Sequence, residues 1–342
     1  LLTFLLNIFV LAKGISGGIE AFAKFAMPTL FIFAIILAVR VLTLGSPVDP
    51  SVSVLDGLGF LWNPDFSSLL NPSVWLSAAG QIFFTLSVGM GAILTYASYL
   101  KESDDIALSG LSTASLNEFA EVVLGGSIAI PAACAFFGLA NAKEIAQSGA
   151  FSLGFVSVPA IFSYLPLGFL FGFLWFSLLF FAGITSSLAL IQPAIAFLED
   201  EFKIKRLPCV LMVGLFIFIF ANFSIFLKGF LDELDFWVGT FFITFFALLE
   251  TVIFIWLFGP DKAWEEINRG ADIRVPKIFY FILKYITPLV LIVIFTSWIF
   301  QNWALVFKET SPGKWVARIF IVIFFTFTGI LVHFAFKKEK KE

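Results

Sequence analysis

Long apolar segments separated by short polar ones run along almost the whole chain. The segments long enough to cross a membrane cover residues 19–43, 72–99, 107–137, 167–199, 207–227, 230–258, 277–306 and 314–336, with a partial one at 1–14. About 20 helical residues, each rising about 1.5 Å, span the roughly 30 Å hydrocarbon core of a bilayer. The pattern predicts eight whole helical crossings, and we expect residues 1–14 to be the end of a further helix.

Turn-forming residues mark the connections between these segments. Glycine, proline, asparagine and aspartate gather in 45–65, 259–262 and 311–313, which we expect to be loops. Residues 138–166 are only moderately apolar and contain several glycines and prolines. We expect this stretch to be a structured hairpin that lies over the protein and does not cross the membrane.

The crossing at 72–99 is interrupted at its centre. Thr85, Ser87, Gly89 and Gly91 follow one another in alternate positions there. Hydroxyls and glycines at that depth weaken a helix, and irregular backbone inside a bilayer is tolerated where it lines a cavity or ligand. The carbonyl end of a half-helix suits Na⁺ and the amide end suits an anionic group, as in secondary transporters. A close-packed interface of small residues is the alternative.

Polar residues in two other crossings are further candidates. Asn117, Glu118 and Glu121 lie within about one helical turn near mid-membrane, where carboxylates are costly and usually functional. Thr185, Ser186 and Ser187 are three consecutive hydroxyl residues, and Thr185 and Ser186 could supply oxygen ligands for a small cation together with the Ala182 carbonyl. The alternatives are a polar network that only packs the bundle, and hydroxyls that bond back to the preceding helical turn.

Several acidic residues have less specific roles. Glu250 is another mid-membrane acid, for which packing and an ion pathway are equally open. Asp232, Glu233 and Asp235 open a helix, where the helix dipole favours acids, so capping is one explanation. Asp200 and its acidic neighbours end a helix, where the dipole disfavours them, which indicates an ion-pair partner elsewhere.

Composition and charge narrow the class of protein. Hydrophobic residues make up 60% of the 342 residues, charged residues 13%, and the net charge is −3. A soluble domain has about 25% charged residues, and no basic stripe for nucleic acid is present. The chain has no catalytic triad, P-loop or zinc-protease motif, and His333 is its one histidine, so we expect no enzyme. We expect Cys134 and Cys209 to be buried and to pack as small hydrophobic residues.

The distribution of basic residues predicts the orientation. With the crossings threaded alternately, most of the 21 lysines and arginines fall on one side, including the 337–341 tail. The positive-inside rule places that side and the C-terminus in the cytoplasm of a multi-pass protein in the cell (inner) membrane.

Taken together, several motifs resemble the neurotransmitter:sodium symporter family, and most closely its bacterial LeuT-type amino-acid transporters. They are GQIFFTLSVGMGAILTYASY (80–99), LNEFAEVVLGGSIAIPAA (116–133), FAGITSSLALIQPAIAFLED (181–200), LDELDFWVGT (231–240) and FGPDKAWEEINRG (258–270). The likeness runs from Leu1 to about Lys338. It implies an all-α membrane protein with the LeuT-type inverted-repeat fold, lacking about the first three to four transmembrane helices.

The resemblance also assigns segments of the chain to family helices. The chain, 1–342, would be a single transmembrane domain. Residues 1–14 would end helix 4 and 19–43 would form helix 5. Residues 72–256 would form the second inverted repeat, helices 6 to 10, and 277–336 would form helices 11 and 12.

Site residues follow from the resemblance position by position. The substrate pocket would use Phe84, Thr85, Ser87, Met90, Ser186 and Leu190. Two Na⁺ sites are implied: the first would use Thr85 and Asn117, and the second would use the Ala182 carbonyl, Thr185 and Ser186. Glu121 stands where chloride-dependent animal members have serine, so its carboxylate would replace chloride. Met90 stands at a pocket position that is often aromatic in the family.

The gates and partners complete the expectation. Phe84 would cover the substrate, Asp235 would belong to the outer gate, and Ser98, Tyr99 and Asp200 to the inner gate. The implied function is Na⁺-coupled symport of a small neutral amino acid by alternating access, independent of chloride. The partners would be this substrate and the lipid bilayer, with no nucleic acid, and a homodimer stays open. A non-transporting membrane sensor or an inactive symporter fragment is the alternative.

Overall fold

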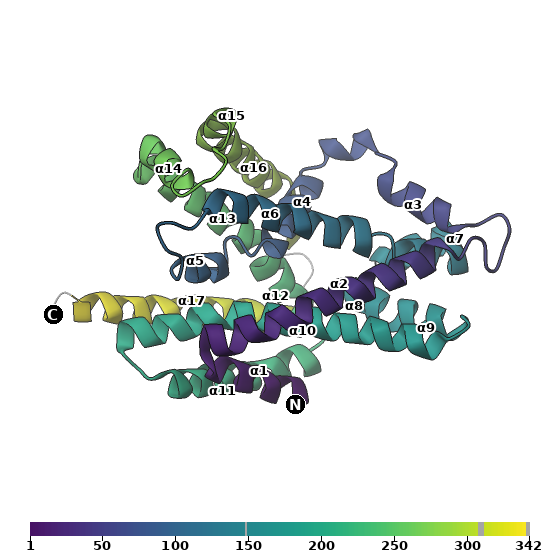
Figure 1. The fold of residues 1–342 in the computed structure, drawn as a ribbon, viewed down its shortest axis with the longest axis horizontal. Helices are drawn as coiled ribbons and strands as arrows, with labels where there is room; N and C mark the ends of the chain where they lie inside the picture. The colour runs from purple at the N-terminus through teal and green to yellow at the C-terminus, as the bar shows by residue number, and fades with distance from the viewer. Residues whose placement is uncertain (148, 307–310, 340–342) are drawn as a thin grey trace. The chain divides into compact units, whose positions relative to one another are not determined.

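The computed structural model describes residues 1–147, 149–306 and 311–339, and in these ranges it contains helices and no strands (Figure 1). The helices fall into two compact units, which are described separately. Unit 1 consists of residues 1–12, 67–111 and 189–342, and unit 2 consists of residues 13–66 and 112–188.

Seven helical segments in the described ranges are long and apolar enough to cross a membrane. They are Ile15–Leu42, Ile106–Ala146, Gly168–Phe202, Arg206–Phe226, Phe230–Leu257, Ile278–Gln301 and Pro312–Lys338. Each matches one of the eight crossings expected from the sequence. The remaining expected crossing, 72–99, is two helices, α4 (Pro72–Thr85) and α5 (Ala92–Ala97), separated by six residues. Neither half is long enough to cross a bilayer on its own.

Unit 1 holds the interrupted crossing and the C-terminal helices. Besides α4 and α5 it contains α1 (Leu2–Ala12), α11 (Arg206–Phe226), α12 (Phe230–Leu234), η5 (Asp235–Phe242), α13 (Ile243–Val252), η6 (Ile253–Leu257), α14 (Pro260–Ile267), α15 (Ile278–Phe281), η7 (Ile282–Ile286), α16 (Thr287–Val306) and α17 (Pro312–Glu339). The segments η5, η6 and η7 are π-helical turns within longer helices. The short helix η2 (Phe66–Leu70) lies at the boundary with unit 2.

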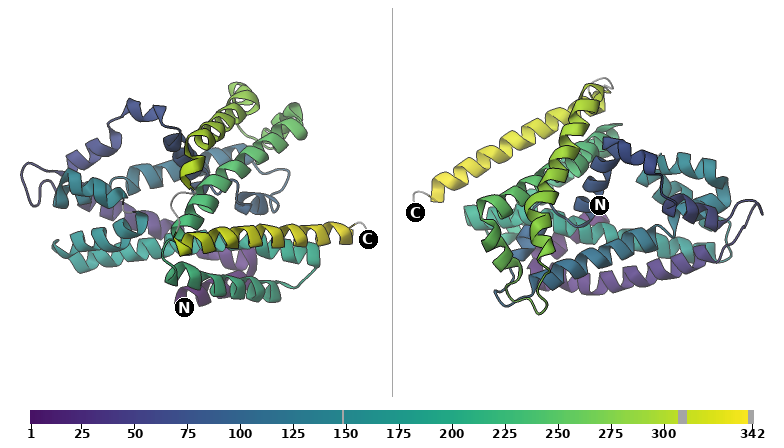
Figure 2. Two further views of the ribbon diagram at one scale, coloured as in Figure 1. Left: turned by 180° about the vertical axis from the view of Figure 1, so that it is seen from behind. Right: turned by 90° about the horizontal axis from the view of Figure 1, so that it is seen from above.

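Contacts between these helices position the interrupted crossing. Helix α4 packs against η5, α13 and α16, and α1 packs against α11 (Figure 2). A small core joins Leu76 of α4 to Ile294, Phe295 and Trp298 of α16. Burying these large side chains fixes one half of the interrupted crossing, because each contributes about 1.5–3 kcal/mol of apolar burial.

Unit 2 is built around a larger apolar core. Its elements are η1 (Ile15–Glu20), α2 (Ala21–Leu42), α3 (Val54–Trp62), η3 (Phe119–Gly125), α7 (Ala129–Gln147), α8 (Ala150–Ser152), η4 (Leu153–Ser157) and α9 (Val158–Ser163). Helices α6 (Ile106–Glu118) and α10 (Gly168–Phe202) have residues in both units. Buried residues of α2, α7, α9 and α10 form the core, among them Leu37, Cys134, Phe162 and Trp175.

A backbone kink separates the crossing from the hairpin that follows it. Gly138 has φ 79° and ψ 160° inside α7, a conformation that favours glycine. The kink lies one residue beyond the expected end of the crossing at residue 137, and the helix continues on its far side to Gln147. Beyond the kink, the stretch expected as a hairpin contains the rest of α7 and the short helices α8, η4 and α9.

All three expected loops contain helical residues, and in 311–313 the residues Pro312 and Gly313 already belong to α17. In 45–65 the expectation was wrong for 54–62, which form α3: the Ser53 backbone N–H and hydroxyl both donate to Asp56, and this capping box starts the helix. Gly57 lets α3 pack directly against α7, because a Cβ there would lie 3.0 Å from the Cys134 Cβ. The turn expected at 259–262 begins α14 at Pro260, since proline suits the first helical position.

Candidate functional site

The interruption of the 72–99 crossing lies where the sequence predicts it. Helix α4 ends at Thr85 and α5 begins at Ala92. Ser87, Gly89 and Gly91 have positive φ values of 57°, 75° and 77°. This left-handed conformation costs a residue with a Cβ about 1–2 kcal/mol, so glycine suits it. The alternating hydroxyls and glycines thus produce a real break in the helix.

The break is packed tightly against α13. A Cβ at Gly89 would clash with the Ile243 carbonyl oxygen and lie 3.1 Å from the Ala247 nitrogen. Only glycine therefore fits at this position, for reasons of both space and conformation. The small residues serve close packing as well as the break, which supports the packing alternative, while the expected binding of ion or substrate at the break stays a prediction.

Glu250 stabilises the irregular backbone. The Gly89 N–H, which has no helical acceptor, donates to Glu250 Oε2 at 3.2 Å. The amides of Leu86, Ser87 and Val88 bond to carbonyls of the last turn of α4. The sequence left Glu250 open between packing and an ion pathway, and the structure shows it as a direct partner of the break.

The residues expected to line the substrate pocket in unit 1 lie at or near the break. Phe84 lies on the last turn of α4, and its side chain is 44% exposed. The Thr85 hydroxyl donates a hydrogen bond to the Ile82 carbonyl at 3.3 Å. Leu190, also 44% exposed, lies on α10. That helix passes close to the break, because a Cβ at Gly91 would lie 3.6 Å from the Pro193 Cβ. Ser87 and Met90 are part of the break itself and half-buried.

The hydroxyl-rich stretch of α10 is continuous helix. The Thr185 hydroxyl donates to the Phe181 carbonyl at 2.8 Å and lies 3.1 Å from the Ala182 carbonyl oxygen. The Ser187 hydroxyl bonds to the Ile184 carbonyl at 2.9 Å. A hydroxyl that donates its proton keeps lone pairs that can face a cation. Bonding back to the helix therefore coexists with the expected sodium-ligand role of Ala182, Thr185 and the exposed Ser186.

Asn117 and Glu121 interact in unit 2. Asn117 is the last residue but one of α6, and Glu121 lies in the π-helical turn η3. The Asn117 amide donates to Glu121 Oε2 at 3.5 Å. π-helical turns often occur at functional sites, because they shift side chains out of regular helical register. The NH2 group of Asn117 is the part that faces the carboxylate, so this contact does not use its carbonyl oxygen.

The expected gate residues are exposed. Asp235 opens η5, and Asp200 lies near the end of α10. Ser98 and Tyr99 follow α5, where the Ser98 hydroxyl bonds to the Thr95 carbonyl at 2.7 Å. Of the acids near Asp235, Glu233 accepts from Arg318 Nε at 2.6 Å and from Trp237 Nε1 at 2.9 Å, which joins α17 to α12.

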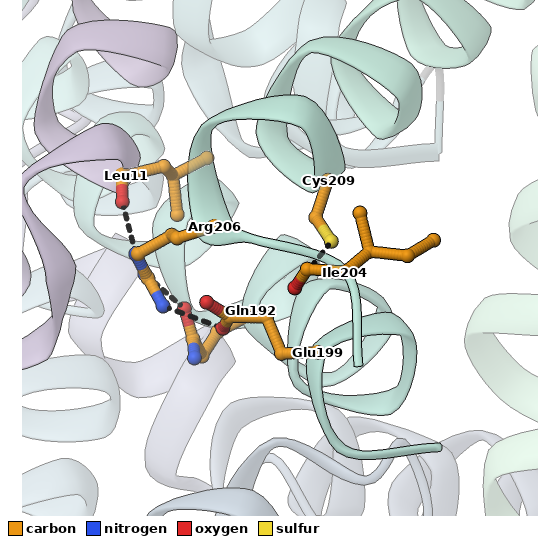
Figure 3. A network of polar contacts seen from close by, with 6 residues as sticks. All are labelled: Leu11, Gln192, Glu199, Ile204, Arg206 and Cys209. Atoms are coloured by element: carbon orange, nitrogen blue, oxygen red, sulfur yellow. Dashed lines mark hydrogen bonds and ion pairs between the residues drawn. The ribbon is translucent and has the colours of Figure 1, made fainter. Parts of the chain in front are cut away.

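Sequence reasoning missed the network around Arg206 (Figure 3). From one guanidinium, Nε donates to the Leu11 carbonyl at 2.7 Å, Nη1 to Glu199 at 3.0 Å and Nη2 to the buried Gln192 at 2.8 Å. The network joins the ends of α1, α10 and α11. Glu199 thus has the ion-pair partner that its unfavourable position at a helix end indicated. Gln192, a polar residue in an apolar helix, was the missed signal.

A second feature that the sequence analysis missed is a group of contacts that join residues 102–105, after α5, to residues 269–272, after α14. Asp105 accepts from the Leu108 N–H and the Asp272 N–H, both at 2.8 Å, so it caps α6 and fastens the segment after α14. These two bonds hold the pKa of the Asp105 carboxyl below its usual value. Arg269 adds an ion pair to Glu102 at 3.2 Å, and Gly270, at φ 71°, lies against the 103–104 backbone. We call these contacts the Asp105 clasp.

The expected site residues are divided between the units. Unit 1 carries Phe84, Thr85, Ser87, Met90, Ser98, Tyr99, Leu190, Asp200 and Asp235, and unit 2 carries Asn117, Glu121, Ala182, Thr185 and Ser186. The residues expected for the second sodium site all belong to unit 2, whereas those expected for the first sodium site and for the substrate pocket are shared out between the two units. The roles of these residues stay predictions.

In the part of the chain that the structure describes, these features define a multi-pass α-helical membrane protein whose segment 72–99 is interrupted. A family model described as the sodium:neurotransmitter symporter family matches residues 1–339. The chain belongs to this family.

Individual relatives agree with this assignment. The chain is 32% identical over 287 residues to an uncharacterized sodium-dependent transporter of Methanocaldococcus jannaschii, which covers 82% of the chain and 56% of the relative. It is 30% identical over 312 residues to an uncharacterized sodium-dependent transporter of Haemophilus influenzae, with coverage of 88% and 65%. A Drosophila persimilis protein named sodium-dependent nutrient amino acid transporter 1 is 30% identical over 293 residues, with coverage of 84% and 43%.

A solved structure supports the fold. The crystal structure of MhsT in complex with L-phenylalanine matches with a TM-score of 0.74 and 29% identity, covering 86% of this chain and 66% of MhsT. The chain therefore has the LeuT-type fold expected from the sequence, a fold of transporters. It spans between 56% and 65% of the length of the curated prokaryotic relatives named above.

Proposed function

We propose that this chain forms most of a Na⁺-coupled symporter for a neutral amino acid that works by alternating access. The observation that carries the proposal is the pair of neutral oxygens on α10, the Thr185 hydroxyl and the Ala182 carbonyl, 3.1 Å apart within a membrane-spanning helix. Neutral oxygens at mid-membrane can replace the hydration shell of Na⁺, which is otherwise lost on leaving water.

The interrupted crossing supplies the second part of the proposal. Thr85, Ser87 and Met90 lie where the helix is broken, and Phe84 stands beside them. Broken helices are where secondary transporters place substrate and coupling ion, because polar backbone ends face the ligand. Sodium bound by Thr85 and Asn117 would favour the state that also binds the zwitterion, with a coupling free energy of about 1–3 kcal/mol.

The proposal of an amino-acid substrate rests on the named relatives. One is named for nutrient amino acids, and MhsT was crystallised with L-phenylalanine. Met90 is flexible and can adapt its shape, so the pocket can accept side chains of different sizes. We propose a cell-membrane location with the C-terminus in the cytoplasm, from the excess of basic residues on that side.

The test measures Na⁺-stimulated binding of each of the twenty amino acids to the full-length protein, purified and reconstituted in liposomes. Thr185→Val keeps the shape but removes the hydroxyl, and should lower the apparent Na⁺ affinity about tenfold. Ser187→Ala is the matched control, because Ser187 lies two residues away and is not assigned to the site. An unchanged Na⁺ affinity in Thr185→Val would refute the second sodium site, and no Na⁺-stimulated binding of any amino acid would favour the non-transporting sensor or fragment.

Chloride independence is a separate part of the proposal. Glu121, held by Asn117 at 3.5 Å, would supply the negative charge that chloride supplies elsewhere in the family. Glu121→Ser should make uptake depend on chloride, measured as uptake with chloride replaced by gluconate. Glu118→Ser, on the same helical surface, should leave uptake independent of chloride. Equal uptake with and without chloride in Glu121→Ser would refute charge replacement.

A further inference from the structure

Unit 2 contains a cavity of about 720 Å³ that the symport site does not use. Its lining includes Arg40 and Thr43 at the end of α2, Phe136 and Phe137 before the Gly138 kink, and Tyr164 and Leu165 before α10. The volume is within the usual range of small-molecule sites, roughly 300–1,000 Å³. The cavity therefore has room for a ligand the size of a lipid headgroup.

The ends of three membrane-spanning segments lie next to the cavity. Segment 15–42 ends at Leu42, the crossing part of 106–146 ends at the Gly138 kink, and segment 168–202 begins at Gly168. The lining residues lie within a few positions of these ends. The cavity is thus at a membrane boundary, the level at which phospholipid phosphates lie.

Arg40 is the charged group of the cavity. Its guanidinium lies over the Phe171 ring, with Cζ 5.7 Å from the ring centroid. Such stacking uses the face of the guanidinium and leaves the N–H groups at its edge available. Among the residues that the structure describes, no side chain forms an ion pair with Arg40, and no acidic residue lines the cavity.

The ordinary role of a basic residue in the last turn of a helix is to cap its carbonyls, and here three of the last four carbonyls already have other donors. The Val39 carbonyl accepts from the Thr43 N–H at 3.1 Å, and the Val41 carbonyl accepts from the Leu44 N–H at 2.9 Å. The Arg40 carbonyl accepts from the Thr43 hydroxyl at 3.0 Å. The guanidinium is therefore not needed as a cap, and its donors suit an external anion.

From this arrangement we infer that the cavity binds a phosphate group through Arg40, with the apolar part of the ligand against Phe136, Phe137 and Leu165. A guanidinium fork matches two phosphate oxygens at once. Tyr164, stacked on Phe136 with ring centroids 6.1 Å apart, adds a hydroxyl at the exposed mouth. The phosphate can come from an anionic phospholipid or from a soluble phosphate ester.

The test counts the phosphatidylglycerol molecules that the purified 342-residue chain retains, by native mass spectrometry, after reconstitution in vesicles of equal phosphatidylglycerol and phosphatidylcholine. Arg40→Gln should lower phosphatidylglycerol retention about tenfold relative to phosphatidylcholine. Arg40→Lys keeps the charge but loses the fork, and should show an intermediate loss. The matched control is Lys143→Gln, since Lys143 also lies over an aromatic ring of unit 2, that of Phe60, at 5.2 Å, but does not line the cavity.

The outcomes separate the alternatives. Loss of retention in Arg40→Gln with wild-type retention in Lys143→Gln supports the site. Displacement of the retained lipid from the wild type by millimolar glycerol 1-phosphate supports it with a soluble source, and resistance to displacement supports it with the lipid as the source. Equal retention in the wild type and Arg40→Gln overturns the inference, and so does an equal loss in Arg40→Gln and Lys143→Gln.

Discussion

Two polar stretches at the centres of membrane segments have similar sequences but different backbones. Residues 85–91 alternate hydroxyls or glycines with apolar residues, and 183–187 combine one glycine with three hydroxyls. The first stretch is a break between two helices, while the second lies inside the continuous α10. The comparison shows that hydroxyls and glycines alone do not break a helix.

The neighbours of each stretch account for the difference. In the break, Gly89 has a positive φ, lies against α13 and donates its N–H to Glu250. In α10, Gly183 keeps helical geometry, and apart from the adjoining backbone of its own helix no atom lies within 4 Å of the position its Cβ would take. A backbone amide that leaves a helix inside a membrane needs another acceptor, and only the first stretch has one.

The largest expected effect comes from replacing Gly89 by alanine, and the comparison is the same replacement at Gly183. Gly89→Ala should destabilise the protein by about 3 kcal/mol or more, because it adds a strained φ and a clash with the α13 backbone. Gly183→Ala should be neutral or stabilise by up to about 1 kcal/mol, because alanine favours a helix. Thermal unfolding in detergent measures both. Equal unfolding temperatures for the two variants would refute the account given for the break.

The Glu250 carboxylate, which accepts the hydrogen bond from the Gly89 N–H, can be removed by a separate substitution. Glu250→Leu should lower the free energy of unfolding by about 1–3 kcal/mol, because it leaves the half-buried Gly89 N–H without its partner. Glu250→Gln is the control, since its amide oxygen can still accept the bond. Unfolding temperatures and Na⁺-stimulated binding should both fall more in Glu250→Leu than in Glu250→Gln. A larger loss in the glutamine variant would show that the charge of Glu250, and not its hydrogen bond, is what matters.

The smallest effect concerns the Asp105 clasp, which fastens the chain after the break. Its hydrogen bonds lower the pKa of Asp105 in the folded protein, so they stabilise the fold fully above the unfolded pKa of about 3.9. This stabilisation is lost as the pH falls towards the folded pKa. The unfolding temperature of Asp105→Asn should therefore lie below that of the wild type at pH 6, and the gap should narrow towards pH 3.

Asp272→Asn is the control for the clasp, because Asp272 contributes its backbone N–H and its side chain is exposed. This variant should follow the wild type across the same pH range. A constant gap between Asp105→Asn and the wild type from pH 6 to pH 3 would contradict the assignment of the titrating group.

The sequence was informative about features that repeat locally. Hydropathy located the crossings, and the alternation of glycine and hydroxyl located the break, because both depend on neighbouring residues. The helix at 54–62 was missed, although Ser53 and Asp56 have the spacing of a capping box, because turn residues surround it. Glu250, Arg206 and Asp105 each have a distant partner, 161, 195 and 167 residues away along the chain. Such contacts depend on packing between helices, which one sequence does not reveal.

The Arg206 network has a consequence for which substitutions the chain can accept. A single planar group reaches a main-chain oxygen, a carboxylate and a side-chain amide on three sides. Lysine carries the same charge on a compact ammonium and cannot present donors in that flat, diverging arrangement. The adjacent Lys205 and Arg206 are therefore not interchangeable, and exchanging their order would keep the local charge while separating three helix ends.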